Sequence, residues 1–125
     1  MTLTREEILA MEPGPTLDEI TAEIACGRKV RMLNEVTNNS FKPQYDKKVI
    51  DEGAGRYNII PRYSTDISAA WEVEERIKEM AIDAPLYIGY YMTELQLIVG
   101  NKGFDMVHAT PEQRCKAALL AVMGL

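Results

Sequence analysis

The sequence predicts an α+β domain in which helices pack on a small, mainly antiparallel sheet. Helix-start signals occur at several separate places, and apolar residues at helical spacing follow each of them. Short runs of strand-forming residues lie between them, bounded by glycine-rich turns. Because a chain of 125 residues normally forms one domain, we expect residues 1–125 to fold as a single unit.

The composition of the chain argues against some classes of binding partner and predicts the cellular compartment. The net charge is −5, from 19 acidic and 14 basic residues, which argues against general nucleic-acid binding and against binding to an anionic membrane. No apolar run approaches a membrane span, and no signal-peptide core is present, so we expect a cytoplasmic protein. Cys26 and Cys115 lie far apart without a CxxC or Cys/His cluster, which predicts free thiols, no zinc site and no cofactor.

The first quarter of the chain predicts two helices. Thr4 and Glu7 form a capping box that opens a short helix. A second capping box at residues 16–19 opens a helix that runs to about Cys26. Gly27 suits the position that follows a helix C-terminus.

The next segment predicts strands and a loop. Residues 30–36 mix apolar and polar side chains and form a candidate first strand, whereas residues 34–48 are polar and predict a long loop. Residues 49–60 predict a hairpin that turns at Gly53 to Gly55.

The central helix is expected to begin within residues 63–73, which carry the only tryptophan. Ser64, Thr65 and Asp66 are all residue types favoured at a helix N-cap. The helix should end at residues 81–84, before a proline. An apolar stripe at helical spacing follows the cap: Ile67, Ala70, Val73, Ile77 and Met80.

We expect the tryptophan to fix how this helix lies on the sheet. Trp71 sits beside the apolar stripe, and we predict that it shares one core with Ile77, Leu97 and Leu119.

The last third of the chain predicts three more strands and a final helix. Residues 86–92, 95–99 and 104–109 are rich in strand formers and suggest an antiparallel meander. Thr110 and Gln113 then form a capping box, and the helix they open ends at Gly124.

The residues that carry chemistry do not form a catalytic set, so we expect no enzyme activity. His108 is the only histidine and has no nucleophile motif nearby. The glycines do not form a phosphate-binding loop. Four acidic residues of the central helix could form a metal site: Glu72, Glu74, Glu75 and Glu79. Arg76 and Lys78 lie among them, which favours a solvated helix face instead.

Aromatic and basic residues form the most distinctive group. Stacking faces beside guanidinium groups suit a nucleotide or another flat anionic ligand, and a helix N-terminus can hold an anion. Tyr87, Tyr90 and Tyr91, on a second predicted strand, belong to the same aromatic group. The alternative to a ligand site is that these tyrosines are structural residues of the sheet, with the arginines at its rim. The candidate ligand-binding residues are Arg56, Tyr57, Arg62, Tyr63, Ser64, Thr65 and Asp66.

Three stretches of the chain resemble the phage ABA sandwich domain family, which consists of small proteins of tailed bacteriophages and prophages. They are residues 63–73, with the tryptophan, residues 4–14, and the last helix from residue 109 to 122. The resemblance implies a three-layer α/β/α sandwich and a phage protein in the host cytoplasm. It implies no established activity and no catalytic residues.

The resemblance leaves three functions open. Small accessory phage proteins often counter host defence, so the protein is expected to bind a host protein or, alternatively, to sequester a small nucleotide-like signal. A third possibility is an accessory protein with neither role. A concave pocket of tyrosine and arginine around Arg62 would favour the ligand, and a flat apolar patch would favour the protein partner. Unpaired sheet edges or a shared tyrosine surface would make a homodimer plausible.

Overall fold

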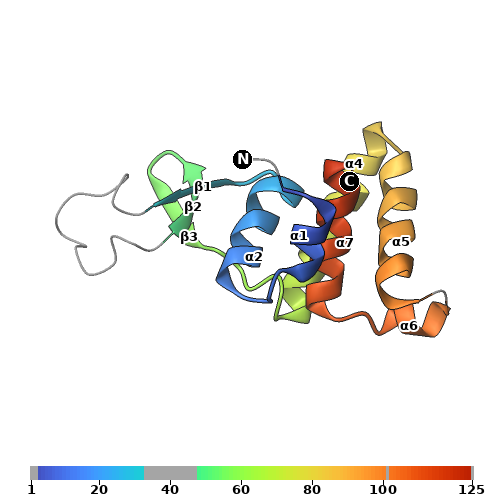
Figure 1. The fold of residues 1–125 in the computed structure, drawn as a ribbon. Coiled ribbons are helices and arrows are strands. Elements are labelled where there is room, and N and C mark those ends of the chain that lie inside the picture. Colours follow the sequence, from blue (N-terminus) through green and yellow to red (C-terminus); the bar gives the residue numbers. More distant parts are fainter. Residues whose placement is uncertain (1–2, 33–47, 101, 125) are drawn as a thin grey trace.

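The computed structural model describes residues 3–32, 48–100 and 102–124. Figure 1 shows the helices as the larger part of the molecule, with the sheet at one end. The helices are α1 (Arg5–Ala10), α2 (Pro15–Ile20), the π-helical turn η1 (Thr21–Ala25), α4 (Ile67–Asp83), α5 (Leu86–Val99), α6 (Gly103–Val107) and α7 (Pro111–Met123). The strands are β1 (Lys29–Met32), β2 (Lys48–Gly53) and β3 (Arg56–Ile59). The predicted α+β class, with helices and a small antiparallel sheet, is confirmed.

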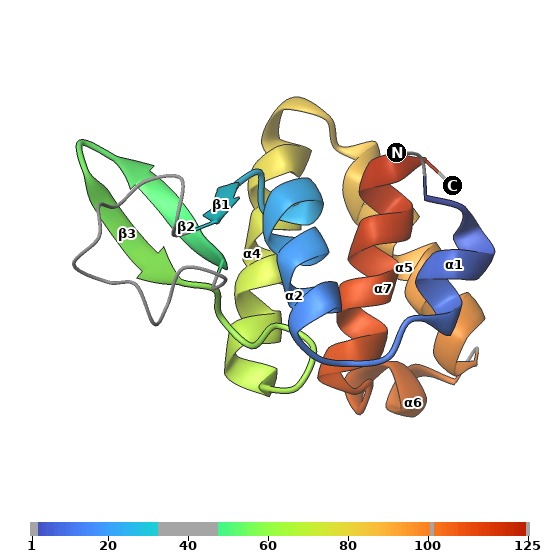
Figure 2. The same cartoon turned by 60° about the vertical axis from the view of Figure 1, so that its left-hand side comes forward.

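The sheet has the order β1-β2-β3, and both pairings are antiparallel. The predicted hairpin is confirmed, with Val49 opposite Ile59 and the turn at residues 53–55. This turn needs glycine, since Gly53 and Gly55 have φ of 84° and 76°. Figure 2 shows the hairpin extending away from the helices. The predicted first strand is confirmed over Lys29–Met32; the rest of it and residues 34–47 of the predicted loop lie outside the described residues.

The core is organised around α7, whose residues 114–121 are all buried. Helices α1, α4, α5 and η1 all contact it. The largest buried side chains of the core come from α1, α2, α4 and α7 and from the segment before α4: Ile8, Leu17, Tyr63, Val73, Ile77, Leu119 and Leu120. The predicted start of α7 is confirmed, since Thr110 and Gln113 cap each other reciprocally.

An ion pair inside the helical part joins α4, α5 and α7. Arg114 Nη1 lies 2.6 Å from Glu74 Oε2, and the hydroxyl of Tyr91 donates a hydrogen bond to the same carboxylate oxygen. Arg114 also donates from Nε to the carbonyl of Ala109 at 3.0 Å. Burial and the neighbouring Glu74 raise the pKa of Tyr91 above its usual value, so the phenol stays protonated. The solvated face predicted for the glutamates of α4 is therefore wrong for Glu74.

The N-terminal helices follow the predicted order, with one correction at a helix start. Thr4 and Glu7 form the predicted capping box. The second helix begins at Pro15 with Gly14 at its N-cap, so the predicted capping box at residues 16–19 is wrong. Proline suits the first helical turn, so Thr16 lies inside the helix and not at its N-cap, and the Glu19 carboxylate pairs with Lys48.

The predicted C-terminal meander is wrong, because residues 86–99 form one helix and residues 103–107 a second, short one. The physical reason is burial at helical spacing. Tyr91 and Leu95 are buried, and Tyr87 and Ile98 are partly buried, which gives one inward face at spacings of three and four. Packing against α7 therefore outweighs the strand preference of tyrosine, isoleucine and valine.

The predicted core is correct for two of its four residues. Ile77 and Leu119 are buried, whereas Trp71 is 54% exposed and Leu97 is 67% exposed. Helix α4 packs through small and branched side chains such as Ala70 and Val73. Trp71 lies outside that stripe and faces solvent.

We predict that Trp71→Ala lowers the free energy of unfolding by less than about 2 kcal/mol, because just over half of the side chain is exposed and its loss opens no enclosed cavity. Ile77→Ala in the same helix should cost about 2–5 kcal/mol, since it opens a cavity at a buried site. Urea denaturation of both variants measures the difference. A loss above about 2 kcal/mol for Trp71→Ala would contradict the position of α4.

Candidate functional site

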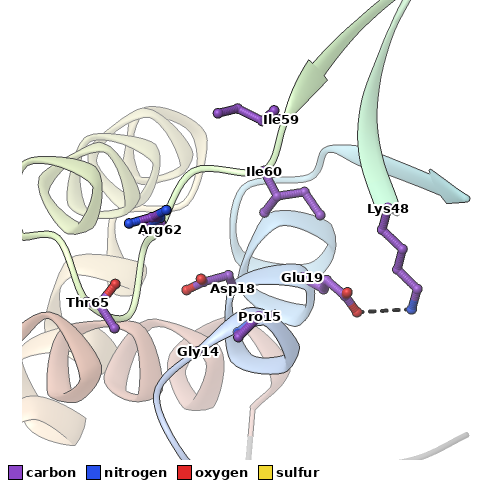
Figure 3. A pocket seen from close by; sticks show the side chains of 9 residues that line it. All are labelled: Gly14, Pro15, Asp18, Glu19, Lys48, Ile59, Ile60, Arg62 and Thr65. Atoms are coloured by element: carbon purple, nitrogen blue, oxygen red, sulfur yellow. Dashed lines mark hydrogen bonds and ion pairs between the residues drawn. The ribbon is translucent and has the colours of Figure 1, made fainter. Parts of the chain in front are cut away.

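A concave site of about 660 Å³ lies where the start of α2, the start of β2 and the segment after β3 meet. Figure 3 shows the side chains around it. The lining residues are Gly14, Pro15, Asp18, Glu19, Lys48, Ile59, Ile60, Arg62 and Thr65. We call this the Arg62 pocket. Part of its lining comes from the segment around Arg62, where the sequence predicted a ligand site.

One wall of the Arg62 pocket is fixed by a buried hydrogen-bond network. Both the backbone N–H and the hydroxyl of Ser64 donate to Asp18 Oδ1, at 2.8 and 2.7 Å. The backbone N–H of Gly14 donates to the Ser64 hydroxyl at 2.8 Å. Asp18 and Ser64 are only 6% and 2% exposed, so these bonds form in a site from which water is excluded. They hold the start of α2 against the segment that leads into α4.

The Arg62 pocket is lined by two acidic and two basic side chains, so their formal charges sum to zero. Lys48 Nζ forms an ion pair with Glu19 Oε2 at 3.0 Å across the opening of the pocket. Arg62 is exposed and makes no ion pair with any described residue. Its guanidinium is therefore free to bind an anion, and Thr65 contributes a hydroxyl to the same lining.

The structure brings only some of the predicted ligand residues together. Arg62 and Thr65 line the pocket, whereas Arg56 and Tyr57 lie on β3 outside the lining. Asp66 acts as the N-cap of α4 and accepts from the backbone N–H of Ser68 at 3.0 Å.

The tyrosine rings predicted to stack on a ligand do not line this pocket. Tyr63 is 2% exposed and belongs to the core, where burial raises the pKa of its phenol, and Ser64 is buried with it. Tyr87 and Tyr90 lie on a helix instead of a strand and pack edge to face, with ring centroids 6.1 Å apart.

Sequence reasoning missed Asp18, Glu19 and Lys48 as lining residues. Asp18 and Ser64 are 46 positions apart, and no local pattern signals such a contact. One sequence feature could have indicated this contact. The Pro-Gly-Pro sequence at residues 13–15 ends the first helix and turns the chain, so that the start of α2 lies next to Ser64.

A second surface, which we call the Trp71 face, runs along the outer side of α4. It consists of Ile67, Trp71, Glu75, Lys78 and Ile82, whose spacing places them on one side of the helix. Trp71 is 54% exposed and Ile82 is 79% exposed. Glu75 and Lys78 form an ion pair at 3.7 Å between the apolar side chains. Large apolar side chains held on a solvent-facing helix are typical of a protein interface.

The other candidate groups have structural partners. His108 is exposed; its Nδ1 lies 3.0 Å from the carbonyl oxygen of Phe104, and the two rings pack with centroids 4.3 Å apart. Cys26 and Cys115 are free thiols, as predicted, and burial raises the pKa of Cys115 to about 12. Within residues 3–32, 48–100 and 102–124, His, Cys, Asp and Glu form no group of three that could hold a metal ion. None of the described helices has both the length and the apolar character that a membrane span requires.

The fold and its surfaces define a small α+β domain that has exposed apolar helix faces and a pocket lined by both apolar and charged residues. The model of the Phage ABA sandwich domain matches residues 21–119, and the chain belongs to that family. The resemblance stated from the sequence is therefore confirmed. No curated protein and no solved structure matches the chain.

We predict that Ser64→Ala destabilises the fold by about 1–3 kcal/mol, because Asp18 loses a donor in a buried site. Thr65→Ala is the matched control, since this neighbouring hydroxyl is exposed, and it should change stability by less than about 0.5 kcal/mol. Thermal denaturation of both variants makes the comparison. Equal stabilities would contradict the role of the Ser64–Asp18 bonds.

Proposed function

We propose that this member of a phage protein family is a non-enzymatic binding protein, which acts in the host cytoplasm by attaching to a host protein through the Trp71 face. The observation that carries the proposal is the exposure of the only tryptophan near the start of α4. Exposed tryptophan costs solubility, and tryptophan is among the residues that most often dominate binding energy at interfaces.

The neighbours of Trp71 support the same function. Ile67 and Ile82 extend the apolar surface along the helix, and the ion pair of Glu75 with Lys78 supplies polar groups beside it. Ile67 and Trp71 thus form an apolar cluster with polar groups beside it, and protein–protein interfaces commonly combine the two. The family context favours a partner in host defence, by analogy with other small phage accessory proteins.

We predict that Trp71→Ala abolishes capture of the host partner. Immobilised protein is incubated with host lysate, and the enrichment of each captured protein is quantified by mass spectrometry. Loss of the indole at the centre of an interface should reduce enrichment of the partner at least tenfold, since such a loss costs about 2 kcal/mol or more.

Phe104→Ala is the matched control for this capture. Phe104 is an aromatic residue that is 75% exposed and lies on α6, outside the Trp71 face. The control should retain the partner. Equal enrichment by Trp71→Ala and the unmodified protein would overturn the proposal for this face.

A second candidate function rests on the Arg62 pocket. Its volume of about 660 Å³ suits a small ligand, and Arg62 supplies an exposed guanidinium for an anionic group. The protein would then sequester a small nucleotide-like signal. The two carboxylates in the lining and the inward position of Tyr63 make this candidate weaker than the Trp71 face.

We predict for this second candidate that Arg62→Ala releases the ligand. Mass spectrometry of small molecules freed by denaturing protein from infected cells gives the readout. Arg56→Ala is the matched control, because Arg56 is an exposed arginine outside the pocket lining. No bound nucleotide in the unmodified protein would exclude the candidate. If the capture experiment also fails, an accessory protein with neither role remains.

A further inference from the structure

Helix α5 presents an uncharged surface to solvent. Its only charged residue is Glu94, which is 9% exposed and forms an ion pair with Arg5 at 2.7 Å. The exposed side chains of α5 include Leu86 and Leu97, each 67% exposed, and Tyr90, 49% exposed. A solvent-facing helix without exposed charge is unusual in a chain whose net charge is −5. Figure 1 shows α5 at the edge of the helical part, on the side away from the sheet.

Four of these outward residues form a stripe with a symmetric spacing. Leu86, Tyr90, Thr93 and Leu97 follow one another at intervals of four, three and four, so they lie on one side of the helix. This order of intervals is the same in both directions along the helix. If a second α5 packs antiparallel on the first about a two-fold axis, Leu86 meets Leu97 of the other copy, and Tyr90 meets Thr93 of the other copy.

A hollow beside this stripe complements the tyrosine. It has a volume of about 430 Å³ and lies between α5 and α7. Its lining residues are Tyr90, Thr93, Glu94, Leu120, Ala121 and Gly124. Thr93, Ala121 and Gly124 are small, which leaves room next to the position that Tyr90 of a second copy would reach. Each large ring would therefore meet a small residue and a hollow, as in helix packing by interdigitation.

The area of this surface is adequate for a specific contact. An antiparallel pair brings the start of α5 in one copy close to α6 in the other, and Phe104 of α6 is 75% exposed. With the stripe, Phe104 offers roughly 500 Å² per copy, or about 1,000 Å² in total, the lower limit for a biological interface.

We infer that a second copy of this chain covers the stripe of α5, forming a two-fold symmetric homodimer with antiparallel α5 helices. The symmetric spacing and the hollow favour this occupant, and the charge distribution permits it. Two copies with a net charge of −5 repel each other, and the stripe of α5 is a surface where no charged side chains face each other across the axis. The dimer does not depend on the proposed function, because its stripe excludes Trp71.

Sedimentation equilibrium of the full chain tests the inference. The chain has a mass of 14.1 kDa, and the expected result is a species of twice that mass at micromolar concentration. Leu97→Asp should raise the dimer dissociation constant at least 30-fold, because it buries a charge in an apolar contact. Met92→Asp is the matched control, since Met92 is 46% exposed on the same helix but lies off the stripe, and it should remain dimeric.

A mixing experiment tests the antiparallel geometry. Leu86→Lys and Leu97→Asp should each be monomeric alone. When they are mixed, Lys at one end should pair with Asp of the other chain, while the remaining two leucines keep their contact, so a heterodimer should form. Circular dichroism confirms that both variants are folded before mixing.

Three results would overturn the inference. They are a monomer at all concentrations, a dimer that Leu97→Asp leaves intact, and folded variants that do not associate on mixing. Trp71→Ala separates this inference from the proposed function, because it should remove the host partner and leave the dimer unchanged.

Discussion

The fold depends on burying α7 along most of its length, which forces two charged side chains into the protein. Arg114 is satisfied by Glu74 of α4 and by backbone carbonyls, and Tyr91 of α5 binds the same carboxylate. Lys116 reaches the carbonyl of Leu9 at 2.9 Å and Glu112 at 2.6 Å. A buried charge without a partner costs several kcal/mol, so these bonds restrict how α4 and α5 can rotate against α7.

This restriction decides which side chains reach solvent. Glu74 is directed toward α7 and lies along one edge of the buried stripe of α4, and Trp71 lies beyond that edge, on the outer side of the helix. With Tyr91 directed inward, the preceding Tyr90 is carried to the outer side of α5. The Trp71 face and the stripe of α5 thus lie on the outer sides of the two helices whose inner sides supply Glu74 and Tyr91 to the contacts around Arg114. The contacts that orient α4 and α5 in the core also decide which side chains form the two candidate binding surfaces.

Local chemistry was predictable from the sequence, and long-range packing was not. The caps at Thr4, Asp66 and Thr110 and the hairpin turn at the glycines depend on residues within a few positions, and all are confirmed. Helix α5 was mistaken for strands because it is apolar on nearly all sides, which hides the helical period. The inward turn of Glu74 depends on Arg114, 40 positions away. The lining of the candidate pocket likewise depends on the contact between Asp18 and Ser64, so only Arg62 and Thr65 could be placed there in advance.

Fluorescence of the only tryptophan tests the central claim, that the Glu74–Arg114 ion pair orients α4 with Trp71 outward. Acrylamide is a neutral quencher, so the acidic residues of α4 do not bias its access. Because just over half of the Trp71 side chain is exposed, native protein should show red-shifted emission and clear acrylamide quenching, with a quenching constant below that of the urea-unfolded chain. A blue-shifted emission that acrylamide quenches only after unfolding would show a buried indole and would contradict the account.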